Sequence, residues 1–256
     1  MNALSPIPAA TAAAPSLWRI HLDEARYEFL RVLRTPAFAL PALSFPLLFY
    51  LLFGVLLSRG EGAASYLLAT YGVFGVMGPG LFAFGVGLAV DRERGLLTLK
   101  RALPVPPGAM LVARVLTAMV FALIIAAMLL VAGTTLGGVA LTPAQAELLL
   151  AIDVLGSIPF CALGLWIGTL VGGSAAPGVV NLIYLPMALL SGLWLPLSML
   201  PAVFSKLAPL WPSWHLAQLA LAVQGQADGG GWALHVGALL LATAVFALLA
   251  RRRLAG

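Results

Sequence analysis

The residues best suited to do chemistry lie in one charged segment between two long apolar runs. Its charged residues are Asp91, Arg92, Glu93, Arg94, Lys100 and Arg101, and Gly95 lies among them. Carboxylates and guanidiniums can form charge-assisted hydrogen bonds with a partner protein, and glycine lets the backbone turn or approach a neighbour closely. Leu96, Leu99 and Leu103 share one face at helical spacing. The segment predicts a short docking helix ended by Pro104, or else a charged loop that only fixes the topology.

The rest of the chain lacks the sequence patterns of catalysis. No G-x-x-x-x-G-K-S/T phosphate loop occurs, so the chain cannot hydrolyse ATP by that route. His21, His215 and His235 are scattered without an H-E-x-x-H pair, and Cys161 is the only cysteine. We therefore expect no catalytic residue and no metal site, and the energy for any transport must come from another chain or from a gradient.

Two polar residues and two glycine pairs interrupt the apolar runs. Asp153 is the only acidic residue near the interior of an expected span, and its place close to the outer end predicts an interfacial position. Asn181 needs a partner in hydrocarbon, which favours a hydrogen bond between helices over contact with a substrate. The Gly-x-x-x-Gly pairs that start at Gly133 and Gly164 indicate tight helix packing more than a transport pathway.

The composition requires a membrane. Of 256 residues, 62% are hydrophobic and only 9% are charged, which leaves too little polar surface for a soluble domain. A membrane-spanning helix needs roughly 20 apolar residues to cross about 30 Å of hydrocarbon. The runs have that length, so we predict an all-α polytopic membrane protein and not a barrel of strands. Six spans are expected near residues 37–57, 66–90, 112–136, 148–171, 179–200 and 232–250.

The basic residues give the expected orientation, because Lys and Arg are retained on the cytoplasmic side of short loops. With the N-terminus inside, twelve basic residues are cytoplasmic and only two, Arg59 and Lys206, are outside. We therefore expect a multi-pass protein of the inner (plasma) membrane with both termini in the cytoplasm. The arginines at 251–253 are interpreted as a stop at the lipid headgroups and not as a nucleic-acid site.

Three segments outside these runs have their own patterns. Residues 1–15 are expected to be a disordered tail, which leaves 16–256 as the membrane domain. Residues 16–34 are amphipathic and predict a helix in the cytoplasmic interface, either a simple anchor or a participant in energy coupling. Its candidate residues are Trp18, Arg19, Arg26 and Arg31. Residues 194–215 are apolar but rich in proline, which favours a re-entrant or interfacial segment on the outer side, followed by a short helix to about residue 223.

At two motifs the chain resembles the integral-membrane subunit of the type 2 ATP-binding-cassette exporters, a family of drug, antibiotic, polysaccharide and sodium exporters. The first motif is the charged segment, which is similar to the coupling helix that sits in a cleft of the ATPase. Its candidate coupling residues are Asp91, Glu93, Arg94, Gly95, Leu99 and Arg101, followed by Pro104-Val105. The second motif is similar to short helices that dip into the outer leaflet. Its residues are Ser191, Gly192, Pro196, Pro201 and Pro212.

This resemblance implies a permease that lines a substrate pathway with a second copy, identical or closely related, and that is driven by two ATPase subunits. ATP and Mg²⁺ would bind to the ATPases, so this chain would hold no cofactor, and membrane lipid would be its remaining partner. The coupling and interfacial helices would carry the closure of the ATPase dimer into the spans. A secondary transporter or channel without an ATPase is the alternative, and a membrane-embedded enzyme or scaffold is the third possibility. The substrate stays open.

Overall fold

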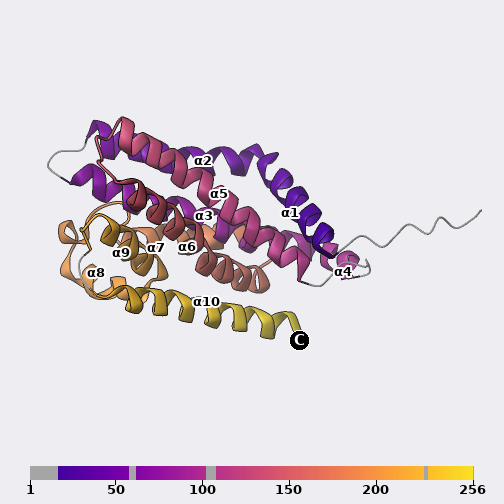
Figure 1. The fold of residues 1–256 in the computed structure, drawn as a ribbon. Coiled ribbons are helices and arrows are strands. Elements are labelled where there is room, and N and C mark those ends of the chain that lie inside the picture. The colour runs from indigo at the N-terminus through magenta and orange to yellow at the C-terminus, as the bar shows by residue number, and fades with distance from the viewer. Residues whose placement is uncertain (1–16, 58–61, 102–107, 228–229, 256) are drawn as a thin grey trace, which may run out of the picture.

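The computed structural model describes residues 17–57, 62–101, 108–227 and 230–255, and helices connected by turns make up this part of the chain, without a strand (Figure 1). The α-helices are α1 (Leu17–Leu33), α2 (Pro36–Phe49), α3 (Ala63–Glu93), α4 (Leu96–Arg101), α5 (Ala109–Thr135), α6 (Pro143–Leu170), α7 (Ala176–Leu190), α8 (Ala202–Leu207), α9 (Pro212–Val223) and α10 (Trp232–Ala255). A π-helical segment, Tyr50–Leu56, extends α2. The expected tail at 1–15 and Pro104-Val105 lie outside the described residues.

Among the described residues, five helices are long and apolar enough to cross a membrane, by length and composition. They are α2 with its π-helical extension, α3, α5, α6 and α10, and each coincides with an expected span. The fifth expected span, at 179–200, was predicted too long, because α7 ends at Leu190 after 15 residues. At about 1.5 Å per residue, α7 is shorter than the hydrocarbon layer.

A left-handed glycine ends α7. Gly192 has φ +73°, and the backbone N–H groups of Gly192 and Leu193 donate to the carbonyls of Leu189 and Ala188. This pair of bonds is a Schellman motif, which stops a helix where glycine follows its last turns. Figure 1 places α8 and α9 at the end of the bundle opposite to α4, so the chain reaches that end through α7 and the segment after it.

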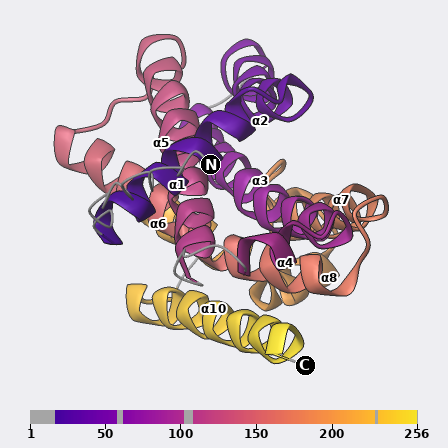
Figure 2. The same cartoon turned by 90° about the vertical axis from the view of Figure 1, so that its right-hand side faces the viewer.

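The central helix is α3, which packs against α2, α5, α6, α7 and α9. Its contact with α6 is close because α6 presents two glycines: a Cβ at Gly164 would lie 2.8 Å from the carbonyl oxygen of Leu81, and one at Gly168 would lie 2.8 Å from that of Gly85. The prediction that this glycine pair serves helix packing is therefore confirmed. In contrast, α10 packs against α6 and α9 and lies at one side of the bundle (Figure 2).

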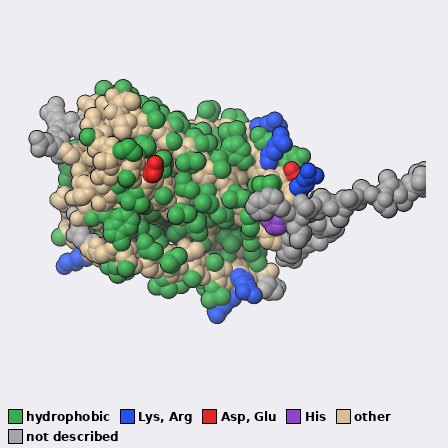
Figure 3. Space-filling model, in the orientation of Figure 1, with side chains coloured by type: hydrophobic (Ala, Val, Ile, Leu, Met, Phe, Trp, Pro, Cys, Tyr) green, Lys and Arg blue, Asp and Glu red, His purple; other side chains and the backbone are tan. Residues whose placement is uncertain are grey.

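The two ends of the bundle differ in charge. We call the end that carries α4, the start of α1 and the last turn of α10 the basic end, and the end that carries α8 and α9 the opposite end. Apolar side chains cover the surface between them, and most of the visible Lys and Arg side chains gather toward the basic end (Figure 3). Among the exposed basic residues are Arg31 on α1, Arg94 directly after α3 and Arg252 on α10.

Candidate functional site

The short helix expected from the sequence is present as α4, at the junction with α3, and its docking role stays a prediction. α3 ends at Glu93, Gly95 turns the chain with φ +70°, and the carbonyl of Gly95 accepts the N–H groups of Thr98 and Leu99. A positive φ is accessible to glycine without a steric penalty, so Gly95 is suited to this turn. Leu99 is 60% exposed on α4, which leaves an apolar side chain available for a partner at the basic end.

Four charged side chains meet behind this junction. We call Glu28, Arg31, Asp91 and Arg114 the four-charge cluster. Arg31 lies 2.6 Å from Oε1 of Glu28 and 3.3 Å from Oδ1 of Asp91. Arg114 Nε lies 3.2 Å from Oε1 of Glu28, and a second nitrogen of Arg114 donates to Oδ2 of Asp91. The cluster joins α1, α3 and α5 with two positive and two negative charges.

Burial makes this cluster sensitive to the loss of a member. Asp91 is 4% exposed and Arg114 is 1% exposed, whereas Arg31 reaches the surface. Burial lowers the pKa of Arg31, but Glu28 and Asp91 outweigh it and hold that pKa above its ordinary value. Removing one partner of a buried ion pair leaves an uncompensated charge, which destabilises more than an intact pair stabilises.

Two further bonds fix the end of α3, one to the last turn of α6 and one to the loop between α6 and α7. The backbone N–H of Gly173 donates to Oε2 of Glu93 over 2.5 Å, and Arg92 donates to the carbonyl of Gly168 over 2.7 Å. Glu93 is nevertheless exposed. The carboxylate expected to bind an ATPase therefore already holds a bond within its own chain.

The predicted residues fall into three groups. Arg94, Gly95 and Leu99 are exposed at the basic end, as are Arg19 and Arg26 on α1. Asp91 and Arg31 instead form part of the four-charge cluster. The helix expected at 16–34 is present as α1, and its position in a membrane interface stays a prediction. The side chains of Trp18 and Arg101 lie outside the described part of the chain.

Sequence reasoning missed Glu28, Arg114 and Gly173 as site residues. Arg114 carried a signal, because it is a single basic residue at the edge of an apolar run, and an ionisable residue in such a run marks a functional or paired position. Glu28 and Gly173 carried none, since only the fold brings them to the α3–α4 junction. The charged segment is therefore one part of a larger site that also includes residues of α1, α5 and the α6–α7 loop.

Asp153 and Asn181 differ in burial, because Asp153 is buried within the bundle and Asn181 is exposed. Asp153 is buried inside the bundle, where a Cβ at Gly72 would lie 2.6 Å from its Oδ2, and its Oδ1 has no hydrogen-bond partner among the described residues. Its predicted place near the membrane interface is not tested by this burial and stays a prediction. Asn181 is exposed on α7 and forms no hydrogen bond within the described part of the chain, which contradicts the expected bond between helices.

The second predicted motif lies at the opposite end. Pro196 and Pro201 precede a 3₁₀ turn, Leu197–Met199, and α8, while Pro212 is the first residue of α9. Proline suits these positions because its fixed φ begins a helical turn without losing a hydrogen bond. The hydroxyls of Ser191 and Ser213 form a hydrogen bond that ties the end of α7 to α9. The short helix expected to reach about residue 223 is confirmed as α9.

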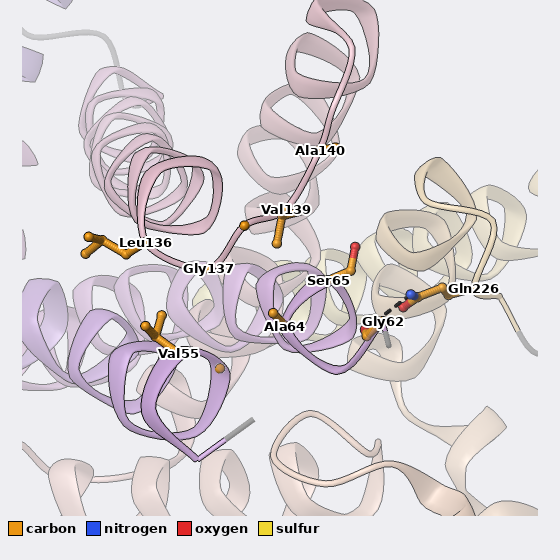
Figure 4. Close-up of a pocket in the computed structure, with 11 residues that line it drawn as sticks. Val55, Gly62, Ala64, Ser65, Leu136, Gly137, Val139, Ala140 and Gln226 are labelled. Atoms are coloured by element: carbon orange, nitrogen blue, oxygen red, sulfur yellow. Dashed lines mark hydrogen bonds between the residues drawn. The ribbon is translucent and has the colours of Figure 1, made fainter. Parts of the chain in front are cut away.

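Hydrogen bonds between uncharged groups join elements at the opposite end. A cavity of about 440 Å³ lies between the start of α3, the turn after α5 and Gln226, whose Nε2 donates to the carbonyl of Gly62 over 3.3 Å (Figure 4). Beside it, the hydroxyl of Ser65 donates to Oε1 of Gln224. These groups tie α3 to the chain after α9 through neutral hydrogen bonds.

A histidine pair connects α9 with α10 at the same end. His215 Nδ1 lies 3.0 Å from His235 Nδ1, and His215 Nε2 lies 2.9 Å from the carbonyl oxygen of Pro209. A carbonyl only accepts, so the neutral His215 donates from Nε2 and accepts at Nδ1 from His235. Burial lowers the pKa of His215, the Pro209 carbonyl raises it and His235 lowers it again, with a net decrease. The contact thus favours a neutral His215 ring.

Comparison with known proteins agrees with this arrangement. The family model described as ABC-2 type transporter matches residues 25–224, which run from α1 to the residue after α9. A curated relative from Bacillus subtilis (strain 168), named "Putative transport permease YvfS", is 27% identical over 192 residues, covering 73% of this chain and 78% of the relative. The family match includes α4, the four-charge cluster and both predicted motifs. On this evidence the chain is a multi-pass membrane protein that belongs to the ABC-2 type transporter family.

Proposed function

We propose that this chain is the permease subunit of an ATP-driven exporter, in which two copies line the pathway and two ATPase subunits dock at the basic end. The family implies ATPase partners in general. Because the sequence has no phosphate loop, ATP and Mg²⁺ would bind to those partners. The basic end then faces the cytoplasm, since Lys and Arg are retained there, and the membrane is the inner (plasma) membrane.

The observation that carries this proposal is the way α4 is exposed while the adjacent end of α3 is bonded to other helices. It presents Leu99 to the outside, while the adjacent α3 end is fixed to α1 and α5 by the four-charge cluster and to the α6–α7 loop by Glu93. A force applied to α4 by a closing ATPase dimer therefore reaches several helices at once. A charged loop that only fixed topology would need no such ties.

Reconstitution with the ATPase that purifies with this chain tests the proposal. Leu99→Glu places a charge on an exposed helical position, so the permease should fold normally while ATPase binding weakens by about tenfold or more, as for a central interface residue. Arg252→Gln, exposed on α10 at the same end, is the control and should bind the ATPase as wild type does. If Leu99→Glu binds the ATPase and supports ATP-dependent export as wild type does, α4 is not the docking element.

The buried carboxylate of Asp153 keeps a secondary transporter as the second candidate, because an ionisable residue inside the spans is what a proton relay uses. The two candidates separate in vesicles that contain the permease with or without the ATPase. The exporter requires ATP and tolerates Asp153→Asn. A proton-coupled transporter works on a pH gradient alone and loses that activity in Asp153→Asn.

A further inference from the structure

Two cavities lie in line along α3, starting from the basic end. The first, of about 520 Å³, is bounded by α1, the start of α2, α3 and α4, and we call it the basic-end cavity. The second, of about 430 Å³, lies between α2, α3 and α7, and we call it the aromatic cavity. Phe38 and Phe82 line both cavities, with ring centroids 6.0 Å apart. The two cavities therefore meet at this aromatic pair.

The mouth of the basic-end cavity is positively charged. Arg31, Asp91 and Arg94 line it. Asp91 is neutralised by Arg31 and Arg114, whereas Arg94 is exposed and forms no hydrogen bond or ion pair within the described part of the chain. The guanidinium of Arg94 is thus available to an anion, for which its fork of N–H donors is well matched.

A buried, unpartnered donor points to the same cavity. Arg114 is 1% exposed, and its Nη1, the terminal nitrogen that does not bond Asp91, has no hydrogen-bond partner among the described residues. A Cβ at Gly87 would lie 3.7 Å from that nitrogen, and Gly87 lines the basic-end cavity. The unsatisfied donor thus lies close to a glycine that lines the cavity, so an anion there would be stabilised by Arg114 as well as by Arg94.

Beyond the mouth the walls become apolar. Val32, Phe38, Phe82 and Val86 line the inner part of the basic-end cavity, and the aromatic cavity adds further rings, including that of Trp194. Asn181 lines the aromatic cavity without an internal hydrogen bond. Both volumes fall within the roughly 300 to 1,000 Å³ typical of ligand pockets. A ligand that spans them would need an anionic head and an apolar chain.

We propose that the two cavities form one binding site for an anionic amphiphile, with the head at Arg94 and the chain extending past the Phe38–Phe82 pair toward Trp194. Binding itself does not depend on an ATPase, whereas the role of this ligand as the exported substrate rests on the proposed function. The head chemistry is shared by an acidic membrane lipid and by a free single-chain phosphate or carboxylate.

Fluorescence quenching tests the site directly. The permease is placed in phosphatidylcholine nanodiscs without an ATPase and titrated with 12-bromododecyl phosphate, whose bromine quenches tryptophan where the chain end lies. We expect saturable quenching that is largely lost in Trp194→Phe. Arg94→Gln, which removes an exposed charge and leaves folding intact, should weaken binding by about tenfold. Val86→Phe, which fills the basic-end cavity, should weaken it similarly, and Arg252→Gln should leave it unchanged.

Two comparisons complete the test. The uncharged 12-bromododecyl maltoside should bind about tenfold more weakly than the phosphate, because it lacks the anion. Replacing half of the lipid by phosphatidylglycerol then separates the sources: displacement of the probe assigns the site to acidic membrane lipid, and retention assigns it to a single-chain anion. The proposed site is wrong if the probe shows no saturable binding, or if its binding is unchanged in both Arg94→Gln and Val86→Phe. The cavities would then be expected to be filled by a second copy of the chain.

The outcome is independent of the docking experiment on Leu99. If the probe binds but no ATPase associates with α4, the site stands and the exporter proposal fails. If the ATPase couples normally but the probe does not bind, only the site is lost.

Discussion

The two ends of the bundle solve the same packing problem with different chemistry. At the basic end, helices α1, α3 and α5 are held together by four charges, three of them on buried side chains. At the opposite end, α3, α7, α9 and α10 are joined by neutral partners: serine with serine, serine with glutamine and histidine with histidine. Charged contacts are strong but costly to leave incomplete, whereas neutral ones are weaker and easier to break. The helices of the basic end should therefore move together as one rigid body, whereas single helices at the opposite end should open locally.

The largest effect is expected from breaking the four-charge cluster. Arg114→Ala leaves the buried carboxylate of Asp91 short of its partner, which should cost about 3 to 5 kcal/mol of stability. Thermal unfolding in detergent measures this loss. The double variant Asp91→Leu/Arg114→Leu removes one positive and one negative charge and leaves the Glu28–Arg31 pair, so most of the stability should return. A melting temperature that is unchanged in Arg114→Ala would show that the basic end is not held by charge.

A smaller effect on stability, but a clear effect on coupling, is expected at Glu93. Because its carboxylate is exposed, loss of the bond to Gly173 in Glu93→Ala should cost only about 1 kcal/mol. Release of the α6–α7 loop from the α3–α4 junction should nonetheless uncouple hydrolysis from export in the reconstituted complex. The measurement is export per ATP hydrolysed. Glu93→Gln keeps an acceptor for the Gly173 N–H and should retain coupling; if it fails as badly as Glu93→Ala, the charge of Glu93 acts on the ATPase directly.

Acidification should loosen only the opposite end. The folded pKa of His215 is lowered, so its contribution to stability is complete above the ordinary histidine pKa of about 6.5 and is lost as the pH falls from there toward the folded pKa. Hydrogen exchange of α9 and α10 at about pH 7.5 and about pH 5.5 measures this local opening. The difference should disappear in His215→Gln and persist in His21→Gln. Equal loosening of α1 would contradict the assignment to the histidine pair.

The smallest effect is expected for Ser65→Ala, which removes one neutral, partly buried hydrogen bond to Gln224. The loss should be about 0.5 to 1.5 kcal/mol, well below that of Arg114→Ala. Thermal unfolding of the two variants under the same conditions compares the ends directly. A loss for Ser65→Ala as large as that for Arg114→Ala would remove the distinction between charged and neutral joints.

The elements that depend on local sequence were predictable, and the partners that depend on distant contacts were not. Five spans, α1, α4 and α9 follow from apolar runs, prolines and helical spacing, because each signal acts within a few turns of chain. α7 was predicted too long because the apolar run continues past Gly192, while the helix stops at a Schellman motif that periodicity does not reveal.

The candidate site shows the same limit. Asp91, Glu93 and Gly95 could be singled out because they are close in sequence, yet the charge of Asp91 was expected to face a partner and instead faces Arg114. The hydrogen bond expected for Asn181 is absent from the described residues and the burial of Asp153 was not predicted, because burial and exposure in a helical bundle depend on which face meets a neighbour. With an overall apolar composition, every face of these helices looks alike in the sequence.

The four-charge cluster also imposes an order on biosynthesis. Glu28 and Asp91 leave the ribosome before Arg114, so a nascent chain that ends short of α5 has two carboxylates of the cluster and only Arg31 to balance them. Chains are made from the N-terminus onward, and early segments can wait for later ones. The contact between α1 and α3 therefore reaches charge balance only when α5 is inserted, which makes the arrival of α5 the step that completes the first half of the membrane domain.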